Sequence, residues 1–489
     1  MARRSKHPVR HLGDVHGVAR GAASSAWRTH RQTESVQEHW ADPTRAAKPG
    51  APAVRFEAAA RVTEPGATLR SRFKLLTINV LAWGWNYARY VLRPRFRPFP
   101  TYQATPERSP GIIKMKRGPV TLALAGDWGS GTYSAYRVAD RITTEFQADY
   151  TIHLGDVYYS GTGREFEDYF MPEDAWPEGT MGTFALNGNH EMYSGGKAYF
   201  HALRQKTRPL FNEKGEQVGE KPGKLTYAVE GQPERLPQDV SYFCLENDHW
   251  RVVALDTGYY AKTFPFLELF DTQLIKLHSA IRQWLKQVVF ADPTDRRPVI
   301  LLSHHEWFSA YDSEYTRMGK QVAPYLDRVL LWFWGHEHRF SAYAPFGLDA
   351  NGAQVRARCI GHGGIPFDIA YPKRHRRLVC SDERISSEST NYVDAEQQLG
   401  FCGFALLRFD GPTLSVAYYD ERQGSAPLLE ETWSREARTG TATGAVTGGA
   451  ALAKYRDGYP KVPPKRVDDL DRINALGGTW RFPEHPPRK

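Results

Sequence analysis

The chain has 489 residues, of which 41% are apolar and 13% aromatic, and this composition excludes a largely disordered protein. Its net charge of +9 is unevenly distributed, because residues 1–118 contain 22 Lys and Arg against 7 Asp and Glu. That part therefore carries +15 and the remainder −6. The basic part is predicted either to contact an anionic surface or to be a solvated arm, and no specific nucleic-acid partner is inferred.

The cysteines and the N-terminus bear on the cellular compartment. No two cysteines have the C-x-x-C spacing, which indicates reduced thiols in an intracellular protein, with two disulfides as the alternative. The first residues lead into polar sequence and lack the apolar stretch of a secretory signal, so we expect a cytoplasmic protein, with peripheral membrane association as an option. The four cysteines are Cys244, Cys359, Cys380 and Cys402.

Residues 1–117 are predicted to form a basic arm. Residues 1–69 show no sustained hydrophobic period and are expected to be mostly flexible. Residues 75–92 are the most apolar run of the arm, but they are barely long enough to span a bilayer and include polar residues that are unfavourable in hydrocarbon. Two interpretations remain for them. One is a helix packed on the following domain, and the other is a helix at an anionic membrane surface, flanked by the arginines within residues 70–97.

From about residue 118 to 425, apolar strands alternate with helices, which is typical of a layered α/β domain. The long polar connections at 208–240 and 367–400 are predicted to be insertions over one face. Residues 426–489 show no core pattern and are predicted to be a C-terminal tail. The predicted strands are 120–125, 150–154, 182–186, 242–246, 250–256, 299–303, 329–334, 355–360, 404–409 and 414–419, and the predicted helices are 135–146 and 272–290.

Five of these strands end on polar residues that follow an apolar run. Because open α/β sheets bind ligands at the carboxyl ends of their strands, we expect these residues to lie together. Taken singly, each motif is explained as well by a turn or by exposed side chains. In chain order they are Gly126-Asp127-Trp128-Gly129, Gly155-Asp156-Val157-Tyr158-Tyr159, Gly188-Asn189-His190-Glu191, Ser303-His304-His305 and Gly335-His336-Glu337-His338.

In this order the motifs resemble those of the calcineurin-like metallophosphoesterase superfamily, and within it the purple acid phosphatases. The resemblance covers about residues 118–340 and implies a four-layer αββα sandwich. Most superfamily members have Asp-x-His in the first motif, whereas Gly129 stands here in place of the histidine. Tyr159 of the second motif would replace that ligand, and a phenolate is a hard donor that suits Fe(III).

The resemblance also implies two metal ions that share one carboxylate, which can bridge ions about 3.5 Å apart. The implied ligands of Fe(III) are Asp127, Tyr159, His338 and one oxygen of Asp156, and those of the divalent ion (Fe, Zn or Mn) are the other oxygen of Asp156, Asn189, His304 and His336.

Two adjacent histidines compete for one ligand position in the fourth motif. Strand alternation allows only one of them to point into the site, and the family spacing favours His304, which leaves His305 to face substrate or solvent. By the same resemblance, His190 would protonate the leaving alkoxide or stabilise its charge, and Glu191 would orient His190. Four further side chains either line the cleft or merely pack, namely Trp128, Tyr158, Tyr193 and His362.

The function implied by the resemblance is hydrolysis of phosphate esters of small molecules, with in-line attack by a metal-bound hydroxide. One alternative keeps the fold but uses Mn or Zn to cleave phosphodiesters or nucleotides. Another is a membrane-associated, non-catalytic binding protein, which only the N-terminal arm favours. A further Asp-x-His-Gly match within residues 13–17 follows no strand and is interpreted as a chance occurrence.

Overall fold

The computed structural model describes residues 98–102, 110–158, 160–212, 216–261, 274–311, 314–344, 346–347, 354–365, 367, 372, 378–384 and 400–436, and the strands at 441–447, 453–454 and 478–481. The features predicted for residues 1–97, including the 75–92 segment and its contact with a membrane, lie outside the described residues, as does Tyr159. Within the described part of the chain, no helix is both long and apolar enough to cross a membrane.

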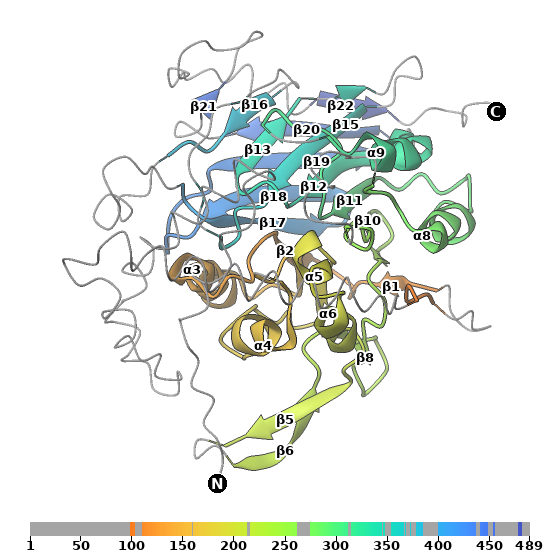
Figure 1. The fold of residues 1–489 in the computed structure, drawn as a ribbon. Coiled ribbons are helices and arrows are strands. Elements are labelled where there is room, and N and C mark those ends of the chain that lie inside the picture. The colour runs from red at the N-terminus through yellow and green to blue at the C-terminus, as the bar shows by residue number, and fades with distance from the viewer. Residues whose placement is uncertain are drawn as a thin grey trace.

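Among the described residues, the strands form two ten-stranded sheets and one separate hairpin (Figure 1). The hairpin of β5 (Thr207–Phe211) and β6 (Gln217–Pro222) projects away from the sheets. The first sheet has the order β1 (Ile112–Lys114), β9 (Phe243–Glu246), β10 (Arg251–Ala254), β11 (Val299–Ser303), β12 (Val329–Trp334), β15 (Gln354–Ile360), β13 (Phe340–Tyr343), β16 (Leu378–Ser381) and β21 (Ala453–Lys454), with β14 (Phe346–Gly347) paired to β15.

The second sheet combines strands from the N-terminal and C-terminal parts of the described chain, since β17 pairs with β2. Its order is β22 (Gly478–Arg481), β20 (Thr441–Thr447), β19 (Leu429–Glu436), β18 (Thr413–Asp420), β17 (Gly403–Asp410), β2 (Val120–Ala125), β3 (Tyr150–His153), β4 (Gly182–Ala185), β7 (Thr226–Tyr227) and β8 (Leu236–Pro237).

The central strands of both sheets are parallel. In the second sheet β2, β3 and β4 run side by side in the same direction, and in the first sheet so do β10, β11, β12 and β15. Their carboxyl ends therefore meet at one edge of each sheet, where side chains that follow the strands can converge.

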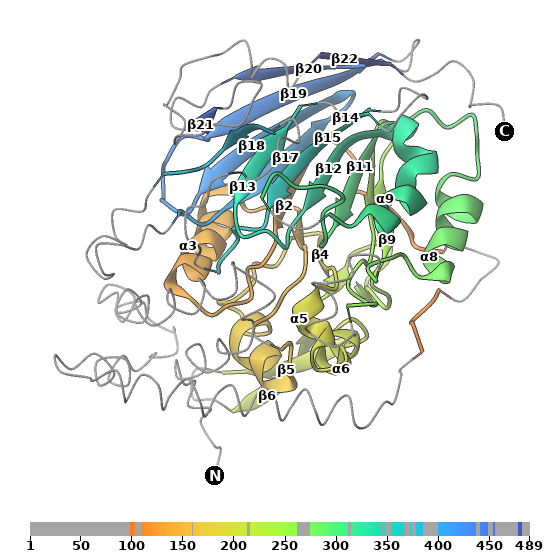
Figure 2. The same ribbon diagram turned by 45° about the horizontal axis from the view of Figure 1, so that its top comes forward.

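Side chains alternate between two cores along these strands. Leu122 and Leu124 of β2 lie in a core shared with Ile300 of the other sheet, whereas Ala123 and Ala125 belong to a core shared with residues of α3. Figure 2 shows α3 beside β2, and α8 and α9 beside β11. The predicted four-layer αββα sandwich is thus confirmed. The α-helices are α3 (Tyr133–Arg141), α4 (Gly163–Glu165), α5 (Asn189–Met192), α6 (Lys197–Ala202), α8 (Ser279–Trp284) and α9 (Thr316–Val322).

Most predicted elements are present at the predicted positions. The strands predicted at 120–125, 299–303 and 329–334 have unchanged bounds, and β9 and β10 form an antiparallel pair. The helix predicted at 272–290 is shorter in its described part, because His278 adopts an extended conformation and its side chain caps Ala280. A wider helical turn then continues from Leu285 to Val289. All four cysteines are free and buried, as expected.

The sheets extend beyond both predicted domain bounds, since β1 precedes residue 118 and β19 follows residue 425. β19 is rich in polar residues, so an apolar pattern does not predict it as a strand of the core. One of these polar residues is nevertheless buried, because it is paired inside the core. Glu431 of β19 accepts two hydrogen bonds from Arg358 of β15, at 2.6 and 2.7 Å, and both side chains are fully buried. This ion pair connects one sheet to the other.

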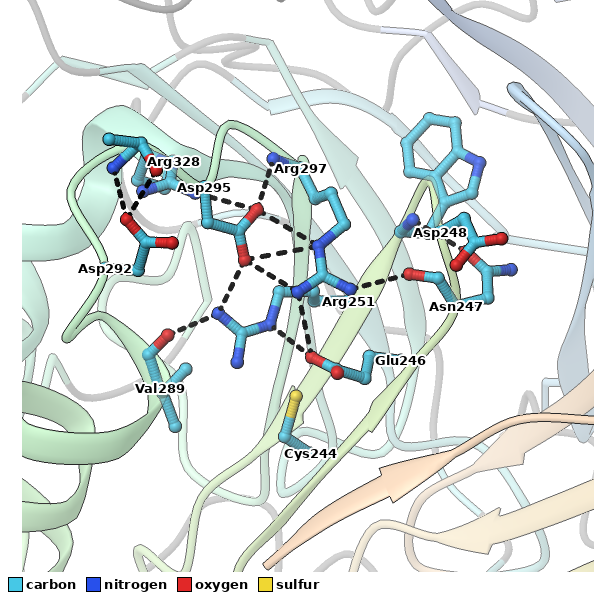
Figure 3. Close-up of polar contacts among 12 residues, drawn as sticks. Cys244, Glu246, Asn247, Asp248, Arg251, Val289, Asp292, Asp295, Arg297 and Arg328 are labelled. Carbon is cyan, nitrogen blue, oxygen red and sulfur yellow. Dashed lines mark hydrogen bonds and ion pairs between the residues drawn. The ribbon is translucent and has the colours of Figure 1, made fainter. Parts of the chain in front are cut away.

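A network of charged side chains closes the amino ends of β10, β11 and β12 (Figure 3). Asp295 lies 2.7 Å from Arg297, 3.3 Å from Arg251 and 3.7 Å from Arg328. Glu246 of β9 pairs with two of these arginines, at 3.2 Å from Arg251 and 3.1 Å from Arg297. Because the carboxyl ends of the same strands lie at the opposite edge, this network stabilises the end of the sandwich remote from the predicted site.

Candidate metal centre

The five motifs lie together at the carboxyl edges of the two sheets, and backbone hydrogen bonds join their loops. The N–H of Asp127, after β2, donates to the carbonyl of Gly155, after β3, at 3.0 Å. The N–H of Gly335, after β12, donates to the carbonyl of His304, after β11, at 3.0 Å. The two sheets are joined at this edge by the N–H of Gly126, which donates to Ile360 at 3.1 Å.

Three residues of the site have a left-handed backbone that is unusual outside glycine. The φ angles are 59° at Asp127, 75° at Asp156 and 67° at His336. Such residues are unfavourable by about 1–3 kcal/mol each, and they persist where the surrounding structure holds them. Here each turn aims a potential metal ligand back toward the sheet edge.

Two glycines permit the close approach of the loops. A Cβ on Gly188 would lie 2.0 Å from Oδ1 of Asp156, and a Cβ on Gly155 would lie 2.8 Å from Nδ1 of His304. Gly155 also has a φ of 107°, which side chains disfavour. The second, third and fourth motifs can therefore meet only because glycine precedes Asp156 and Asn189.

One group of donor atoms gathers around Asp127. The Tyr158 hydroxyl lies 2.8 Å from Oδ1 of Asp127, 3.0 Å from Nε2 of His338 and 3.5 Å from Oδ2 of Asp156. Nε2 of His338 is itself 3.5 Å from Oδ1 of Asp127. Two carboxylates, an imidazole and a phenol thus converge, which is a donor set that suits a hard cation such as Fe(III).

The phenol described at this position belongs to Tyr158, for which the sequence predicts cleft lining or packing. Val157 forms a parallel bridge with Gly129, and the N–H of Tyr158 donates to Gly129 at 2.9 Å. The Tyr158 hydroxyl lies 3.5 Å from Oδ2 of Asp156, so both side chains face the same site. The signal in the sequence was the pair of adjacent tyrosines, which spacing alone resolved in favour of Tyr159.

A second group of donors lies on the other side of Asp156. Oδ1 of Asn189 is 3.0 Å from Nε2 of His304 and 3.0 Å from Nδ1 of His336. Nε2 of His304 is 3.3 Å from Oδ2 of Asp156. Asp156 therefore stands between the two groups, and the set Asp127, Asp156 and His304 has its ligand atoms within 4.8 Å of one another.

Neighbouring groups fix the orientation of these donors. Nδ1 of His304 lies 3.0 Å from the carbonyl of Leu154, which leaves Nε2 to face Asp156. The amide of Asn189 donates to the Tyr193 hydroxyl at 2.8 Å, so its oxygen points toward the histidines. His305, by contrast, is held at Nδ1 by the Thr257 hydroxyl at 3.0 Å. His304, His305 and His336 have ligand atoms within 4.8 Å of one another, and His305 is fully buried instead of facing solvent.

The electrostatics of the site suit positively charged ions. Burial and the charges of Asp127 and Asp156 raise the pKa of Tyr158 well above its usual value. Burial would also raise the pKa of Asp156, but the neighbouring His304 and His190 hold it well below its usual range. Burial lowers the pKa of His304, yet Asp156 raises it to about 9 overall. Without metal, the histidine holds a proton in the position that a metal would take, so the donor set fits positively charged ions.

His190 and Glu191 are adjacent in the chain, but their side chains contact different parts of the site. Nε2 of His190 is 3.8 Å from Oδ2 of Asp156, and its ring packs 4.5 Å from that of Tyr158. The Glu191 carboxylate accepts hydrogen bonds from the N–H groups of Asp156, Val157 and Gly188 at 3.1, 2.9 and 2.9 Å. Glu191 therefore ties the second motif to the third, and the expected contact with His190 is not among these bonds.

The other side chains considered for the cleft fall into two classes. Trp128 is fully buried, and its ring nitrogen donates to the carbonyl of Ala135 at 2.6 Å, so it packs. His362 is buried as well, and burial lowers its pKa to about 3. Tyr193 lies at the site through its contact with Asn189. The Asp-x-His-Gly match at residues 13–17 lies outside the described residues.

The sandwich, its paired carboxylates and its histidines define a metal-dependent phosphoester hydrolase. Residues 120–340, which contain all five motifs, match the sequence model of the calcineurin-like phosphoesterases. A comparison with curated proteins finds no match.

Solved structures resemble the chain only distantly. The purple acid phosphatase PPD1 of yellow lupin is 15% identical with a TM-score of 0.40, over 66% of this chain and 55% of that one. GAP50 of Plasmodium, described as the anchor in the inner membrane complex, is 13% identical with a TM-score of 0.37, over 74% of this chain and 95% of that one. PhoD is 11% identical with a TM-score of 0.37, over 74% of this chain and 77% of that one. The chain thus spans about half the length of the lupin protein.

Proposed function

We propose that this chain is a phosphatase of the purple acid phosphatase type, with Fe(III) and a divalent ion, Fe, Zn or Mn, held in one cage. Asp127, His338 and a tyrosine would hold the ferric ion, Asn189, His304 and His336 would hold the divalent ion, and Asp156 would bridge them. Two such ions would lower the pKa of a coordinated water and neutralise the phosphate oxygens.

The observation that carries the proposal is the position of the Tyr158 hydroxyl, 2.8 Å from Asp127 and 3.0 Å from His338. A buried phenol between a carboxylate and an imidazole would ionise only beside a strong Lewis acid, because burial and the carboxylates keep its pKa high. We assign the phenolate to Tyr158 because its hydroxyl lies among Asp127, Asp156 and His338. Tyr159, the residue favoured by family spacing, is the alternative.

His190 would supply the proton that the leaving group needs. Its side chain is about one fifth exposed and lies beside Asp156, so it can reach both the bridge and a bound substrate. A protonated imidazole there would donate its Nε2 proton to the leaving oxygen of the ester. The ester oxygen would then leave as an alcohol instead of an alkoxide, which is a poor leaving group. Tyr193 packs 4.8 Å from the His190 ring and would restrict its orientation.

Reconstitution of the metal-free protein tests the proposal. We expect hydrolysis of p-nitrophenyl phosphate only when two ions are bound per chain, with iron plus a divalent ion more active than Mn or Zn alone. Asp156→Asn should lose both ions and the activity, whereas Asp140→Asn on α3, a matched aspartate outside the cage, should keep both. Bis-p-nitrophenyl phosphate serves to separate monoester from diester preference.

Two outcomes would overturn the proposal. Full activity with Mn or Zn alone and none with iron would favour the phosphodiesterase or nucleotidase alternative. Two bound ions without hydrolysis of either ester would favour a non-catalytic binding protein.

A further inference from the structure

His336 is contacted at both ring nitrogens by groups from different parts of the fold. Its Nδ1 lies 3.0 Å from Oδ1 of Asn189, inside the cage. Its Nε2 lies 3.1 Å from the hydroxyl of Tyr315, outside the cage. Tyr315 is buried and occupies the N-cap position of α9, the helix that crosses from β11 to β12. The crossover that connects two ligand-bearing strands thus also places a hydroxyl against one of the ligands.

This arrangement bears on the tautomer of His336. A histidine binds a metal only through an unprotonated nitrogen, so binding at Nδ1 requires the proton of the neutral ring at Nε2. The oxygen of Asn189 alone would favour the opposite tautomer, because it accepts a hydrogen bond from Nδ1–H. The Tyr315 oxygen is an acceptor on the other side, where it can receive Nε2–H.

The ring of His336 is also held by a neighbouring histidine. The His305 ring centroid lies 4.8 Å from that of His336 and 5.0 Å from that of Tyr315. His305 is fixed in turn, because its backbone N–H donates to the Thr257 hydroxyl at 3.0 Å and its Nδ1 contacts the same hydroxyl. Rotation of His336 away from the cage would therefore displace a packed aromatic layer.

We propose that Tyr315 is a positioning residue for the divalent subsite, which selects the metal-binding tautomer of His336 by accepting its Nε2 proton. The proposal rests on the metal cage of the proposed function but does not require iron or hydrolysis. Tyr315 contacts His336 of the divalent subsite, whereas Nε2 of His338 faces Tyr158 and Asp127 inside the ferric subsite. The effect of Tyr315 should accordingly be confined to one of the two ions.

Calorimetric titration of the metal-free protein with Zn²⁺ tests this inference without any activity measurement. For Tyr315→Phe, which keeps the ring and removes the acceptor, we expect the affinity of one of two sites to fall about 10- to 100-fold. The affinity of the other site and the Tm of the metal-free protein should be unchanged. Tyr311→Phe is the matched control, because this buried tyrosine lies in the same connection and its ring packs under Arg339 at 3.9 Å.

Each other outcome overturns the proposal. Equal affinities in Tyr315→Phe and Tyr311→Phe would show that the hydroxyl has no part in metal binding. A loss at both sites together with a lower Tm of the metal-free protein would show a general structural role. If the wild type binds one Zn²⁺ only, the dinuclear proposal fails. The Tyr315 proposal then stands only if that single affinity falls in Tyr315→Phe and not in Tyr311→Phe.

Discussion

The hydroxyl of Tyr158 lies 2.8 Å from Oδ1 of Asp127, and the two residues follow neighbouring parallel strands. Both side chains are buried, at 1% and 0% exposure, so a carboxylate and a hydroxyl meet away from water. Asp156 adds a second buried carboxylate 3.5 Å from the same hydroxyl. Such a concentration of acidic groups is stable only if protons or metal ions compensate it.

Removal of the metals should therefore destabilise the protein. Chelation and dialysis are expected to lower the Tm, because the buried carboxylates lose their compensating charge. If the loaded protein is studied with metal at 1,000 times its dissociation constant, removing the metal should lower the free energy of unfolding by about 4 kcal/mol. Calorimetric scans of the loaded and metal-free protein measure it, and identical scans would contradict the assignment of the cage.

His190→Ala should reduce turnover by about 10²- to 10⁴-fold, the usual contribution of a general acid. The metal content should not change, since the His190 side chain contacts the bridge only at 3.8 Å. The loss should be larger for alkyl phosphates than for p-nitrophenyl phosphate, whose leaving group needs no proton. An equal loss with both substrates would rule out proton donation by His190.

The strand ends and the sandwich could be predicted from the sequence because each apolar run ends abruptly at Gly-Asp, Gly-Asn, Ser-His or Gly-His, which marks the sheet edge. The position of the Tyr158 hydroxyl between Asp127 and His338 could not, because it joins residues 31 and 180 positions apart in the chain. The contact of Tyr315 with His336 spans 21 residues and has no local pattern. The tail strands were missed for a related reason, since Glu431 is buried through Arg358 on a distant strand.

The Arg358–Glu431 pair gives a stability prediction independent of the site. Both side chains are fully buried, so Glu431→Gln leaves the guanidinium without a counter-charge. The expected loss is about 3–5 kcal/mol in the free energy of unfolding, as for other broken buried pairs. Replacing both partners with apolar residues, as in Arg358→Met with Glu431→Leu, should recover much of it. Urea titration measures both variants, and a loss as large in the double variant would contradict this explanation.

The network in Figure 3 predicts a pH dependence. Burial acts to raise the pKa of Asp295, but hydrogen bonds from Arg297 and the charge of Arg251 lower it to about 2. An unfolded aspartate titrates near pH 3.9, about two units higher. The folded state thus binds fewer protons between these values, and the contribution of Asp295 is complete above about pH 4 and lost as the pH falls through 2. Asp295→Asn should have a lower free energy of unfolding than wild type at pH 6. In denaturant titrations, this difference in the free energy of unfolding should become smaller toward pH 3. A difference in the free energy of unfolding that does not change with pH would contradict the role given to the ionised Asp295 carboxylate.

The central claim is that a tyrosine of the second motif binds iron, and the visible spectrum tests it most directly. We predict that the iron-loaded, oxidised protein is purple or pink, that Tyr158→Phe abolishes this colour while iron is retained, and that Tyr159→Phe preserves it. Loss of colour in Tyr159→Phe alone would contradict the assignment of Tyr158. A colourless wild type with a full complement of iron would contradict the account as a whole.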